Sequence, residues 1–177
     1  MIHRITFRLL RLAVPIAFLS GCAGMSGSFT PSLSVSTDEF DNTKIVSQPP
    51  VDAGSSAKEG GHTLGFEWRQ RHPDTVIITV GITGWYGISG VEFTADGKSI
   101  TDTKPEGLTV TQADWSKRPY SMSWDDFMKI ADAQSVEMKV IVSGGPTVAT
   151  FGPAHPGVAV NSKFAPFLKK VSEYRSK

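Results

Sequence analysis

The sequence is poor in cysteine, because Cys22 is the only one among 177 residues. A single cysteine cannot form a disulfide within the chain, so we expect the fold to be held together by its hydrophobic core. Long hydrophobic runs are also missing. The apolar stretch at residues 12–19 is less than half of the roughly 20 residues that a helix needs to cross a bilayer, and it contains Pro15. A membrane-spanning helix is therefore excluded at this stretch.

Acidic residues are absent before Cys22, whereas three arginines and a histidine give this segment a positive charge. The basic segment is followed by the apolar stretch at residues 12–19 and by two small residues at 20–21. A basic start, a short apolar centre and small residues at a cleavage site are the parts of a secretory signal. The sequence therefore predicts that residues 1–21 are a signal peptide that is removed.

The residues around the cysteine, Leu19-Ser20-Gly21-Cys22, resemble the lipobox of bacterial lipoproteins. The resemblance implies that a diacylglycerol is attached to the sulfur of Cys22 and that the chain is cut just before it. Aspartate after the cysteine would favour retention at the inner membrane, but Ala23 stands there. The resemblance thus implies an anchor in the outer membrane of a Gram-negative cell, or in the outer leaflet of the cytoplasmic membrane where a cell has one membrane. Two or more acyl chains bind a bilayer stably, so the membrane is the first expected partner.

A strong charge of one sign is missing from the expected mature chain. Removing residues 1–21 takes away three of the 18 Lys and Arg residues and none of the 17 Asp and Glu residues, which leaves a formal net charge of −2. Nucleic-acid-binding proteins need a concentrated basic surface, so we expect no nucleic-acid partner. Residues 22–32 are mostly small and uncharged, which is typical of a flexible tether. Residues 33–177 have a suitable length for a single globular domain.

Alternating apolar and polar residues predict a series of β-strands in this domain. The strongest alternation covers residues 64–69 and 76–83, and a turn at residues 72–74 joins them into a hairpin. Asp96-Gly97 predicts a second tight hairpin, because two-residue hairpin turns need positive φ angles. Residues 48–61 have no periodicity and are rich in Gly, Pro and Ser, so we expect a long loop there. The other expected strands lie at residues 33–36, 44–46, 99–103, 108–110, 136–142 and 147–151.

Two helices are expected late in the sequence. Ser123 can cap a short helix near residues 124–133, and the aspartates that follow suit the positive N-terminal end of a helix. An apolar stripe predicts a second helix near 162–175, with Asn161 as its N-cap. Strands outnumber helices, and the two do not alternate along the chain. The expected fold is α+β, mainly an antiparallel β-sheet or sandwich with helices at one face or end.

Sequence motifs for catalysis, cofactors and metals are missing. Four glycines recur every three residues between positions 81 and 90, but phosphate-binding loops have a different spacing, so we expect bulges and a tight connection. The histidines His62, His72 and His155 lack metal-ligand spacing, and Ser143 is outside any nucleophile-elbow motif. We therefore predict no catalytic residue, no cofactor and no metal site, and we favour binding over catalysis.

Aromatic residues supply the candidate binding surface. Five of them fall at expected loops and element ends rather than on the alternating core faces: Trp85, Tyr86, Trp115, Tyr120 and Trp124. The favoured interpretation is that these rings close the ends of a β-sandwich. The alternative is a binding surface, because tryptophan and tyrosine are enriched at interaction hot spots.

Three functions are open at this point. The first is a lipid-anchored cell-envelope protein that binds or assembles with an envelope partner protein. The second is a carbohydrate- or peptidoglycan-binding module whose loop aromatics contact the glycan of the cell wall. The third and least favoured is an envelope hydrolase whose residues meet only in the folded chain. A cleft with His62 or His155 beside Ser, Asp or Glu would favour the hydrolase.

Overall fold

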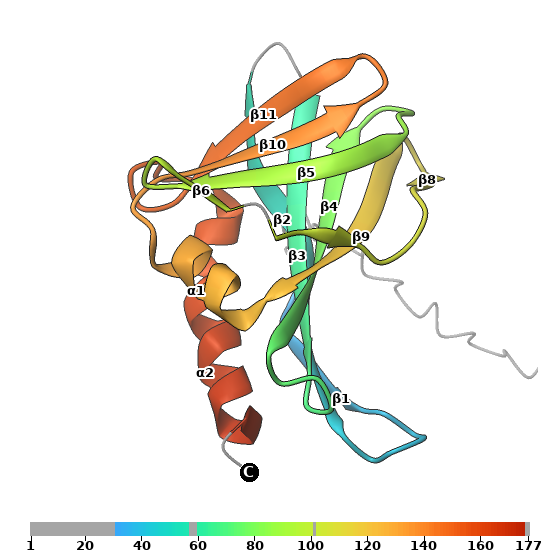
Figure 1. Ribbon diagram of the computed structural model, residues 1–177, viewed down its shortest axis with the longest axis vertical. Coiled ribbons are helices and arrows are strands. Elements are labelled where there is room, and N and C mark those ends of the chain that lie inside the picture. Colours follow the sequence, from blue (N-terminus) through green and yellow to red (C-terminus); the bar gives the residue numbers. More distant parts are fainter. Residues whose placement is uncertain (1–30, 57–59, 101, 176–177) are drawn as a thin grey trace, which may run out of the picture.

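Two antiparallel β-sheets make up most of the computed structural model, which describes residues 31–56, 60–100 and 102–175 (Figure 1). The larger sheet contains β1 (Ser34–Thr37), β2 (Lys44–Ser56), β3 (Gly60–Arg69), β4 (Thr75–Thr83), β7 (Lys104–Pro105), β8 (Val110–Gln112) and β9 (Trp115–Ser123). The smaller sheet contains β5 (Ile88–Ala95), β6 (Lys98–Ile100), β10 (Val136–Val142) and β11 (Gly145–Phe151). The helices are α1 (Trp124–Asp132), α2 (Phe164–Arg175) and the 3₁₀ helix η1 (Ala159–Ser162). This architecture confirms the expected α+β fold.

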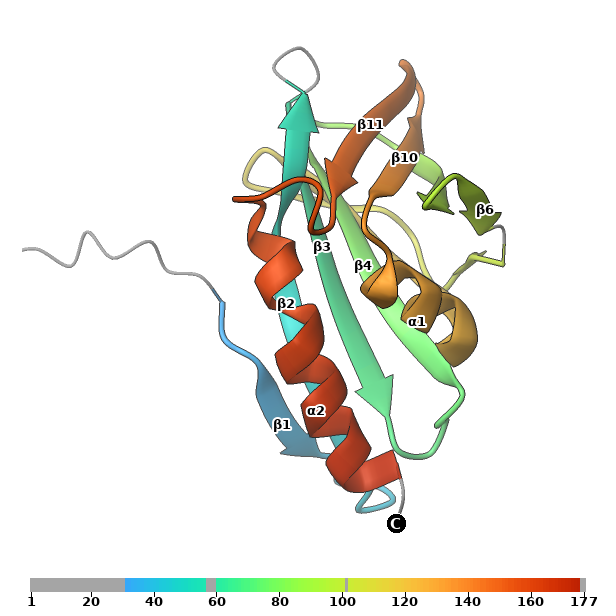
Figure 2. The same cartoon turned by 90° about the vertical axis from the view of Figure 1, so that its left-hand side faces the viewer.

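The strand order leaves one face of the larger sheet uncovered. The order is β1-β2-β3-β4-β9-β7, with β8 also paired to β9, and the smaller sheet runs β11-β10-β5-β6. The smaller sheet crosses one half of the larger sheet, and α1 and α2 lie against the other half on the same side (Figures 1 and 2). We call this covered side the inner face. No described helix or strand layer covers the opposite, outer face.

One hydrophobic core lies between the two sheets and the helices. Leu64, Phe66 and Trp68 of β3 are buried in it, whereas Glu67 and Arg69 alternate with them onto the outer face and are partly exposed. The inward residues of β4 and β10 join the same core, as their alternation predicts. The Phe66 ring meets rings from both helices, at centroid distances of 5.4 Å to Phe127, 5.0 Å to Phe164 and 4.8 Å to Phe167.

The two predicted hairpins are confirmed. β3 and β4 pair along seven positions, with Leu64 opposite Val80 and Phe66 opposite Ile78. The indole of Trp68 donates a hydrogen bond to the Pro73 carbonyl at 3.0 Å and fixes the turn between the strands. In the β5–β6 hairpin, Asp96 and Gly97 have φ angles of +47° and +78°, as a tight two-residue turn requires.

The loop prediction for residues 48–61 is wrong. β2 extends from Lys44 to Ser56, and β3 starts at Gly60; residues 57–59 lie outside the described part of the chain. β2 pairs with β3 despite two shifts of register, between Gln48 and Val51 and between Asp52 and Ser55. The prolines lie in the first shift, where a missing N–H costs no ladder hydrogen bond. These irregularities interrupted the alternation that would have predicted the strand.

Strand β9 was not predicted, although it is an internal strand of the larger sheet, between β4 and β7. It pairs with β4 along its whole length, from Thr75–Ser123 to Thr83–Trp115. Its inward positions mix polar and apolar residues, so the strand has no clear hydrophobic alternation. Two expected strands have different bounds: the one at 99–103 is β6, with residue 101 outside the described part, and the one at 108–110 begins only at Val110 as β8.

The first helix is capped as predicted, and the second is not. The Ser123 hydroxyl accepts a hydrogen bond from the Asp126 backbone N–H at 3.1 Å and so caps α1. Asn161 lies in η1, and its side chain instead bonds the backbone of Gly152 and His155, so it is not the N-cap of α2. Neither helix in the described part of the chain has the length and apolar character needed to span a bilayer. Cys22, the signal segment and residues 22–30 of the tether lie outside the described residues.

Candidate functional site

Trp85 and Tyr86 lie in the tight connection between β4 and β5. Gly84 has a φ angle of +109°, and a side chain there would collide with the ring of Tyr86. The Ser116 hydroxyl of β9 donates to the Gly84 carbonyl at 2.8 Å and accepts from the Tyr86 N–H at 2.9 Å. The connection is thereby fixed to the neighbouring strand, and the glycine is required at this bend.

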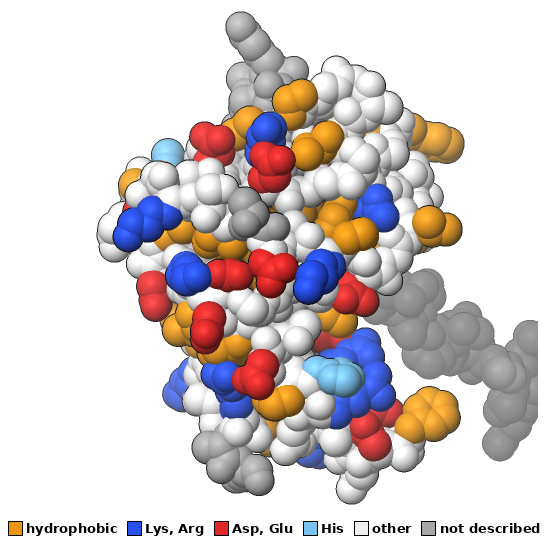
Figure 3. All heavy atoms as spheres, in the orientation of Figure 1, with side chains coloured by type: hydrophobic (Ala, Val, Ile, Leu, Met, Phe, Trp, Pro, Cys, Tyr) orange, Lys and Arg blue, Asp and Glu red, His pale blue; other side chains and the backbone are white. Residues whose placement is uncertain are grey.

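The indole of Trp85 stands in solvent but has a fixed position. Trp85 is 77% exposed. Its Nε1 donates a hydrogen bond to Oδ1 of Asp114 at 3.1 Å. Asp114 lies in the turn between β8 and β9, close to Leu108 and Val110 along the chain. Leu108 is 83% exposed and Val110 is 63% exposed. We call Trp85, Tyr86, Leu108 and Val110 the aromatic end. Figure 3 shows hydrophobic side chains on several parts of the visible face, interspersed with polar and charged ones.

The other three predicted surface residues lie elsewhere. Trp115 begins β9 and is half-buried, with its ring 3.2 Å from where a side chain at Gly61 would lie. Tyr120 is in the middle of β9 and only 1% exposed, so its placement at a loop was wrong. Trp124 begins α1 and packs under the guanidinium of Arg175, 4.5 Å from the ring centroid. Of the five aromatics, the structure brings only Trp85 and Tyr86 together as an exposed pair.

Burial also changes the chemistry of Tyr120. Loss of water around the ring raises the pKa of its phenol above the ordinary value of 10.0, and the nearby Arg118 guanidinium opposes this shift. The phenol oxygen has no hydrogen-bond partner among the described residues. Arg118 lies 5.6 Å from the ring centroid and donates to the Ile88 and Gly107 carbonyls. Tyr120 is therefore a residue of the hydrophobic core between the sheets and not part of an exposed binding surface.

A groove crosses the outer face of the larger sheet. One part has a volume of about 380 Å³ and lies over Thr75 and Ile77 of β4, with Glu106 at its rim. A second part of about 450 Å³ continues past Pro50 of β2 and Pro119 of β9. The two parts share four lining residues, so they form one continuous depression, which we call the outer groove.

The bulge in β2 forms one wall of the outer groove. Pro49 and Pro50 lie where the register between β2 and β3 shifts, between Gln48 and Val51. Pro50 lies directly against Gly65 of β3, since a Cβ at position 65 would be 2.7 Å from the Pro50 nitrogen and 2.9 Å from the Gln48 carbonyl oxygen. Glycine at position 65 therefore allows the bulge to approach β3 and to raise this wall.

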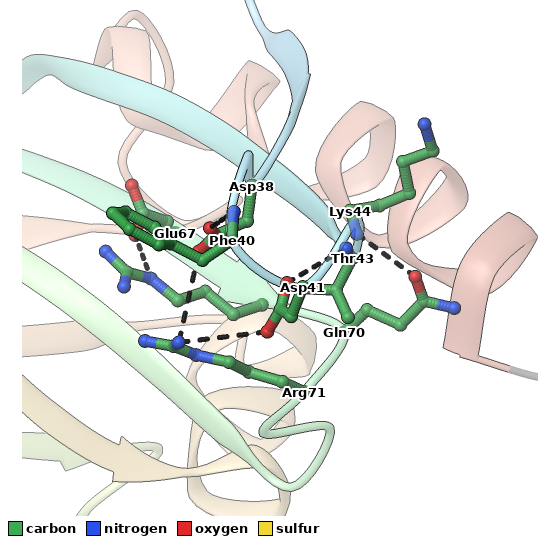
Figure 4. Close-up of polar contacts among 9 residues, drawn as sticks. Asp38, Phe40, Asp41, Thr43, Lys44, Glu67, Gln70 and Arg71 are labelled. Carbon is green, nitrogen blue, oxygen red and sulfur yellow. Dashed lines mark hydrogen bonds and ion pairs between the residues drawn. The ribbon is translucent and has the colours of Figure 1, made fainter.

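Charged side chains surround the end of the outer groove next to the β1–β2 connection (Figure 4). Nε of Arg69 donates to Oε1 of Glu67 at 2.7 Å, which pairs these two charges. The guanidinium of Arg71 is 3.9 Å from the Asp38 carboxylate and 3.8 Å from the Asp41 carboxylate. These distances are too long for hydrogen bonds. The two carboxylates thus attract Arg71 and offset its positive charge, and Arg71 lines the groove.

The β1–β2 connection is held in one conformation and presents Phe40. Asp38 accepts a hydrogen bond from the Phe40 N–H at 3.0 Å, and Asp41 accepts from the N–H and the hydroxyl of Thr43 at 3.0 and 2.6 Å. The Thr43 hydroxyl is the main reason that the pKa of Asp41 is lower than its ordinary value. Phe40 is 99% exposed. An apolar residue within an acidic turn was the sequence signal for this feature, and the sequence analysis missed it.

The histidines do not form a metal site or a recognisable catalytic triad in the described residues. His62 is buried in β3, with Nε2 at 2.9 Å from the Thr147 hydroxyl, whereas His72 lines the outer groove. Nε2 of His155 is 3.1 Å from the Ser135 hydroxyl, and no carboxylate among the described residues hydrogen-bonds to His155. Within residues 31–56, 60–100 and 102–175, no group of three or more His, Cys, Asp or Glu residues is arranged to hold a metal ion.

Comparison with known proteins adds no relative. No protein-family model matches the sequence, and a search of curated proteins finds no significant match. The aromatic end and the outer groove are therefore the basis on which a function is inferred.

Proposed function

We propose that this chain is a lipid-anchored cell-envelope protein that binds an envelope partner protein through the aromatic end. The observation that carries the proposal is Trp85, whose large apolar side chain is exposed and yet fixed by its hydrogen bond to Asp114. Tryptophan at the centre of an interface commonly contributes about 2 kcal/mol or more to binding. Because the indole is already fixed, little side-chain entropy is lost when a partner covers it.

The neighbours of Trp85 support the same proposal. Leu108 and Val110 are exposed apolar residues on a segment that is far from Trp85 in sequence but joined to it through Asp114. The Thr109 hydroxyl ties this segment to the backbone of Ile88, at the start of β5. Grouped apolar side chains on a surface favour a protein contact, whereas single exposed ones need no explanation. The two segments together offer a small, ordered docking surface.

The anchor in this proposal comes from the lipobox resemblance at Leu19–Cys22. A lipid on Cys22 would keep the aromatic end at a membrane surface, where partner and protein meet at a higher local concentration than in free solution. Replacing Cys22 with Ala tests this part. We expect the variant to lack the acyl mass and to leave the membrane fraction or to stay unprocessed. Unchanged membrane fractionation together with an unchanged fatty-acid label would contradict the anchor.

Glycan binding is the second candidate, and one observation favours it. The Trp85 ring is exposed next to Asp114, and an aromatic ring beside a carboxylate can stack on a sugar while accepting hydrogen bonds from its hydroxyl groups. Oδ1 of Asp114 already accepts a hydrogen bond from the indole of Trp85, which leaves Oδ2 as an acceptor for a ligand. The two candidates use the same residues, so the experiment has to include both ligands.

The double variant Trp85→Ser/Tyr86→Ser tests the surface. We expect capture of a specific envelope protein from cross-linked cells to be lost, while the melting temperature stays close to that of the unchanged protein. Phe40→Ser is the control, because Phe40 is also a solvent-exposed aromatic residue but lies in the β1–β2 connection. Sedimentation with insoluble peptidoglycan is run in parallel. Loss of sedimentation without loss of a protein partner would favour the glycan candidate, and a large fall in melting temperature would exclude a surface role for both residues.

A further inference from the structure

Strand β1 forms one edge of the larger sheet, and this edge is open. β1 is the first strand in the order of that sheet, and no described strand pairs with its other side (Figure 2). Its four residues are all exposed and include neither a charge nor a proline. The outer strand β7, in contrast, consists of a lysine and a proline, and β6 begins with a lysine. Charges and prolines commonly protect sheet edges from pairing, so β1 is an unprotected edge.

The pairing between β1 and β2 determines which backbone groups of β1 face outward. The Asp38 N–H donates to the Thr43 carbonyl at 2.8 Å, so these two opposite residues form a hydrogen-bonded pair. Hydrogen-bonded and non-bonded pairs alternate along an antiparallel ladder. Ser34 and Ser36 therefore bond to β2, whereas the N–H and C=O groups of Val35 and those of the residue after Ser36 point away from the sheet. These outward groups are the donors and acceptors that a further strand needs.

The side chains on this edge are complementary to those of a second copy. Val35 is 39% exposed, and it lies opposite the fully buried Val46, so its side chain extends the apolar inner face to the edge of the sheet. If two β1 strands pair antiparallel about a two-fold axis at Val35, the two Val35 side chains lie directly opposite each other. Ser34 of each copy then lies opposite Ser36 of the other. Cross-strand contact between β-branched side chains stabilises a sheet, and both small serines fit on the outer face.

The charges next to β1 favour the antiparallel direction. Three acidic residues, Asp38, Glu39 and Asp41, follow the strand in the β1–β2 connection. In a parallel pair, the two acidic connections would lie side by side, and like charges directly opposite each other destabilise a sheet. In the antiparallel pair centred on Val35, they lie at opposite ends, and Asp38 of one copy lies opposite the uncharged Ser32 of the other. The edge is thus self-complementary in charge as well as in shape.

We propose that two copies of this chain pair through β1 about a two-fold axis at Val35 and so join their larger sheets into one continuous sheet. A contact along a four-residue strand is much smaller than the roughly 1,200–2,000 Å² that stable interfaces bury, so the dimer is weak in free solution. The lipid anchor of the proposed function strengthens it, because copies held on one membrane by tethers of equal length meet at a high local concentration. The pairing does not involve the aromatic end, which remains free for a partner protein.

Disulfide cross-linking tests the pairing and its register. The processed chain is inserted in vesicles of phosphatidylethanolamine and phosphatidylglycerol, as Ser34→Cys, as Ser36→Cys or as a mixture of both, and is then oxidised. In the proposed register, positions 34 and 36 of the two copies form a non-hydrogen-bonded pair with Cα atoms about 4.5 Å apart. Disulfides need Cα atoms within about 7 Å, so we expect the mixture to give about tenfold more linked dimer than either variant alone.

The unchanged chain is the control for the anchor, because Cys22 is its only cysteine. A linked dimer of the unchanged chain would show that the Cys22 thiol is free, which would contradict the lipid anchor and not the pairing of β1. Mass spectrometry of the linked peptides distinguishes a disulfide at position 22 from one between positions 34 and 36.

Charge variants at Val35 separate pairing from chance collisions. When both cysteine variants also contain Val35→Lys, two like charges lie opposite each other, and we expect the cross-link to fall to the level of the single variants. When one contains Val35→Lys and the other Val35→Glu, the charges are opposite and the cross-link should return, which an effect on folding alone would not produce. Equal cross-linking in all mixtures, no link between positions 34 and 36, or a link from position 34 in cells to a different protein would each overturn the proposal.

Discussion

The Phe66→Ala substitution removes a side chain that connects the larger sheet to both helices. Phe66 is 2% exposed, and its ring lies within 5.4 Å of three other rings, measured between centroids. Removing a buried phenylalanine costs about 3–5 kcal/mol through lost burial and the cavity that remains. Each aromatic pair adds about 0.5–1.5 kcal/mol. We expect a loss near the upper end, because the surrounding rings belong to two different helices that cannot both move in to fill the space.

Urea unfolding followed by tryptophan fluorescence measures this loss. A domain of this size is stabilised by about 5–15 kcal/mol, so the expected change is a large fraction of the total. Phe40→Ala is the matched control: the same atoms are removed from a residue that is 99% exposed, and we expect a change within about 0.5 kcal/mol. Phe66→Leu, which leaves a smaller cavity, should show a smaller loss and keeps the measurement possible if the alanine variant does not fold.

Two outcomes would refute this account of the core. A Phe66→Ala loss below about 1 kcal/mol would mean that the helices contribute little to stability through this contact. A Phe40→Ala loss equal to that of Phe66→Ala would mean that the β1–β2 connection is buried in solution. Either result would require a different packing of α1 and α2 on the larger sheet.

Two further predictions follow from the same structure. Gly65→Ala should destabilise the fold by about 1–3 kcal/mol and disturb the wall of the outer groove, because a Cβ at position 65 would collide with the backbone of Pro50 and Gln48. Gly87→Ala is the control: a Cβ at position 87 has open space around it, so this variant should change the free energy of unfolding in urea very little. The hydrogen bond from Lys129 and, to a lesser extent, the one from Ser123 lower the pKa of the Asp126 carboxyl below 3.8. The stability that the folded protein gains from these hydrogen bonds is therefore present above pH 3.8 and is lost as the pH falls through the lowered pKa. The difference in unfolding free energy between the unchanged protein and Asp126→Asn should therefore shrink on acidification; a difference that grows would contradict this sign.

Local patterns predicted the fold wherever a strand has one buried and one exposed face. β3, β4, β10 and the Asp96-Gly97 turn follow this rule, and the sequence was sufficient for them. β2 and β9 do not follow it. β2 is long and bent by bulges that accommodate two consecutive prolines. β9 pairs along its whole length with β4, which is more than 30 residues away in sequence, so its place depends on tertiary pairing. Local propensity cannot report such pairing.

The candidate sites were predictable only in part for a related reason. Trp85 and Tyr86 follow glycines at a turn, and a turn keeps large side chains outside the core, so their exposure could be anticipated. Tyr120 could not be distinguished from them, because the strand that buries it was not recognised. The outer groove depends on residues from β2, β3, β4 and the segment after β7, which the sheet order alone brings together. No spacing along the sequence indicates it.

The place where the chain enters the described domain connects the groove with the proposed anchor. The Pro31 carbonyl accepts a hydrogen bond from Nε2 of Gln48 at 3.1 Å, immediately beside the prolines that form the groove wall. Cys22 precedes Pro31 by nine residues, and a fully extended chain of this length spans at most about 32 Å. A lipid on Cys22 would therefore hold this wall within about 30 Å of the membrane surface.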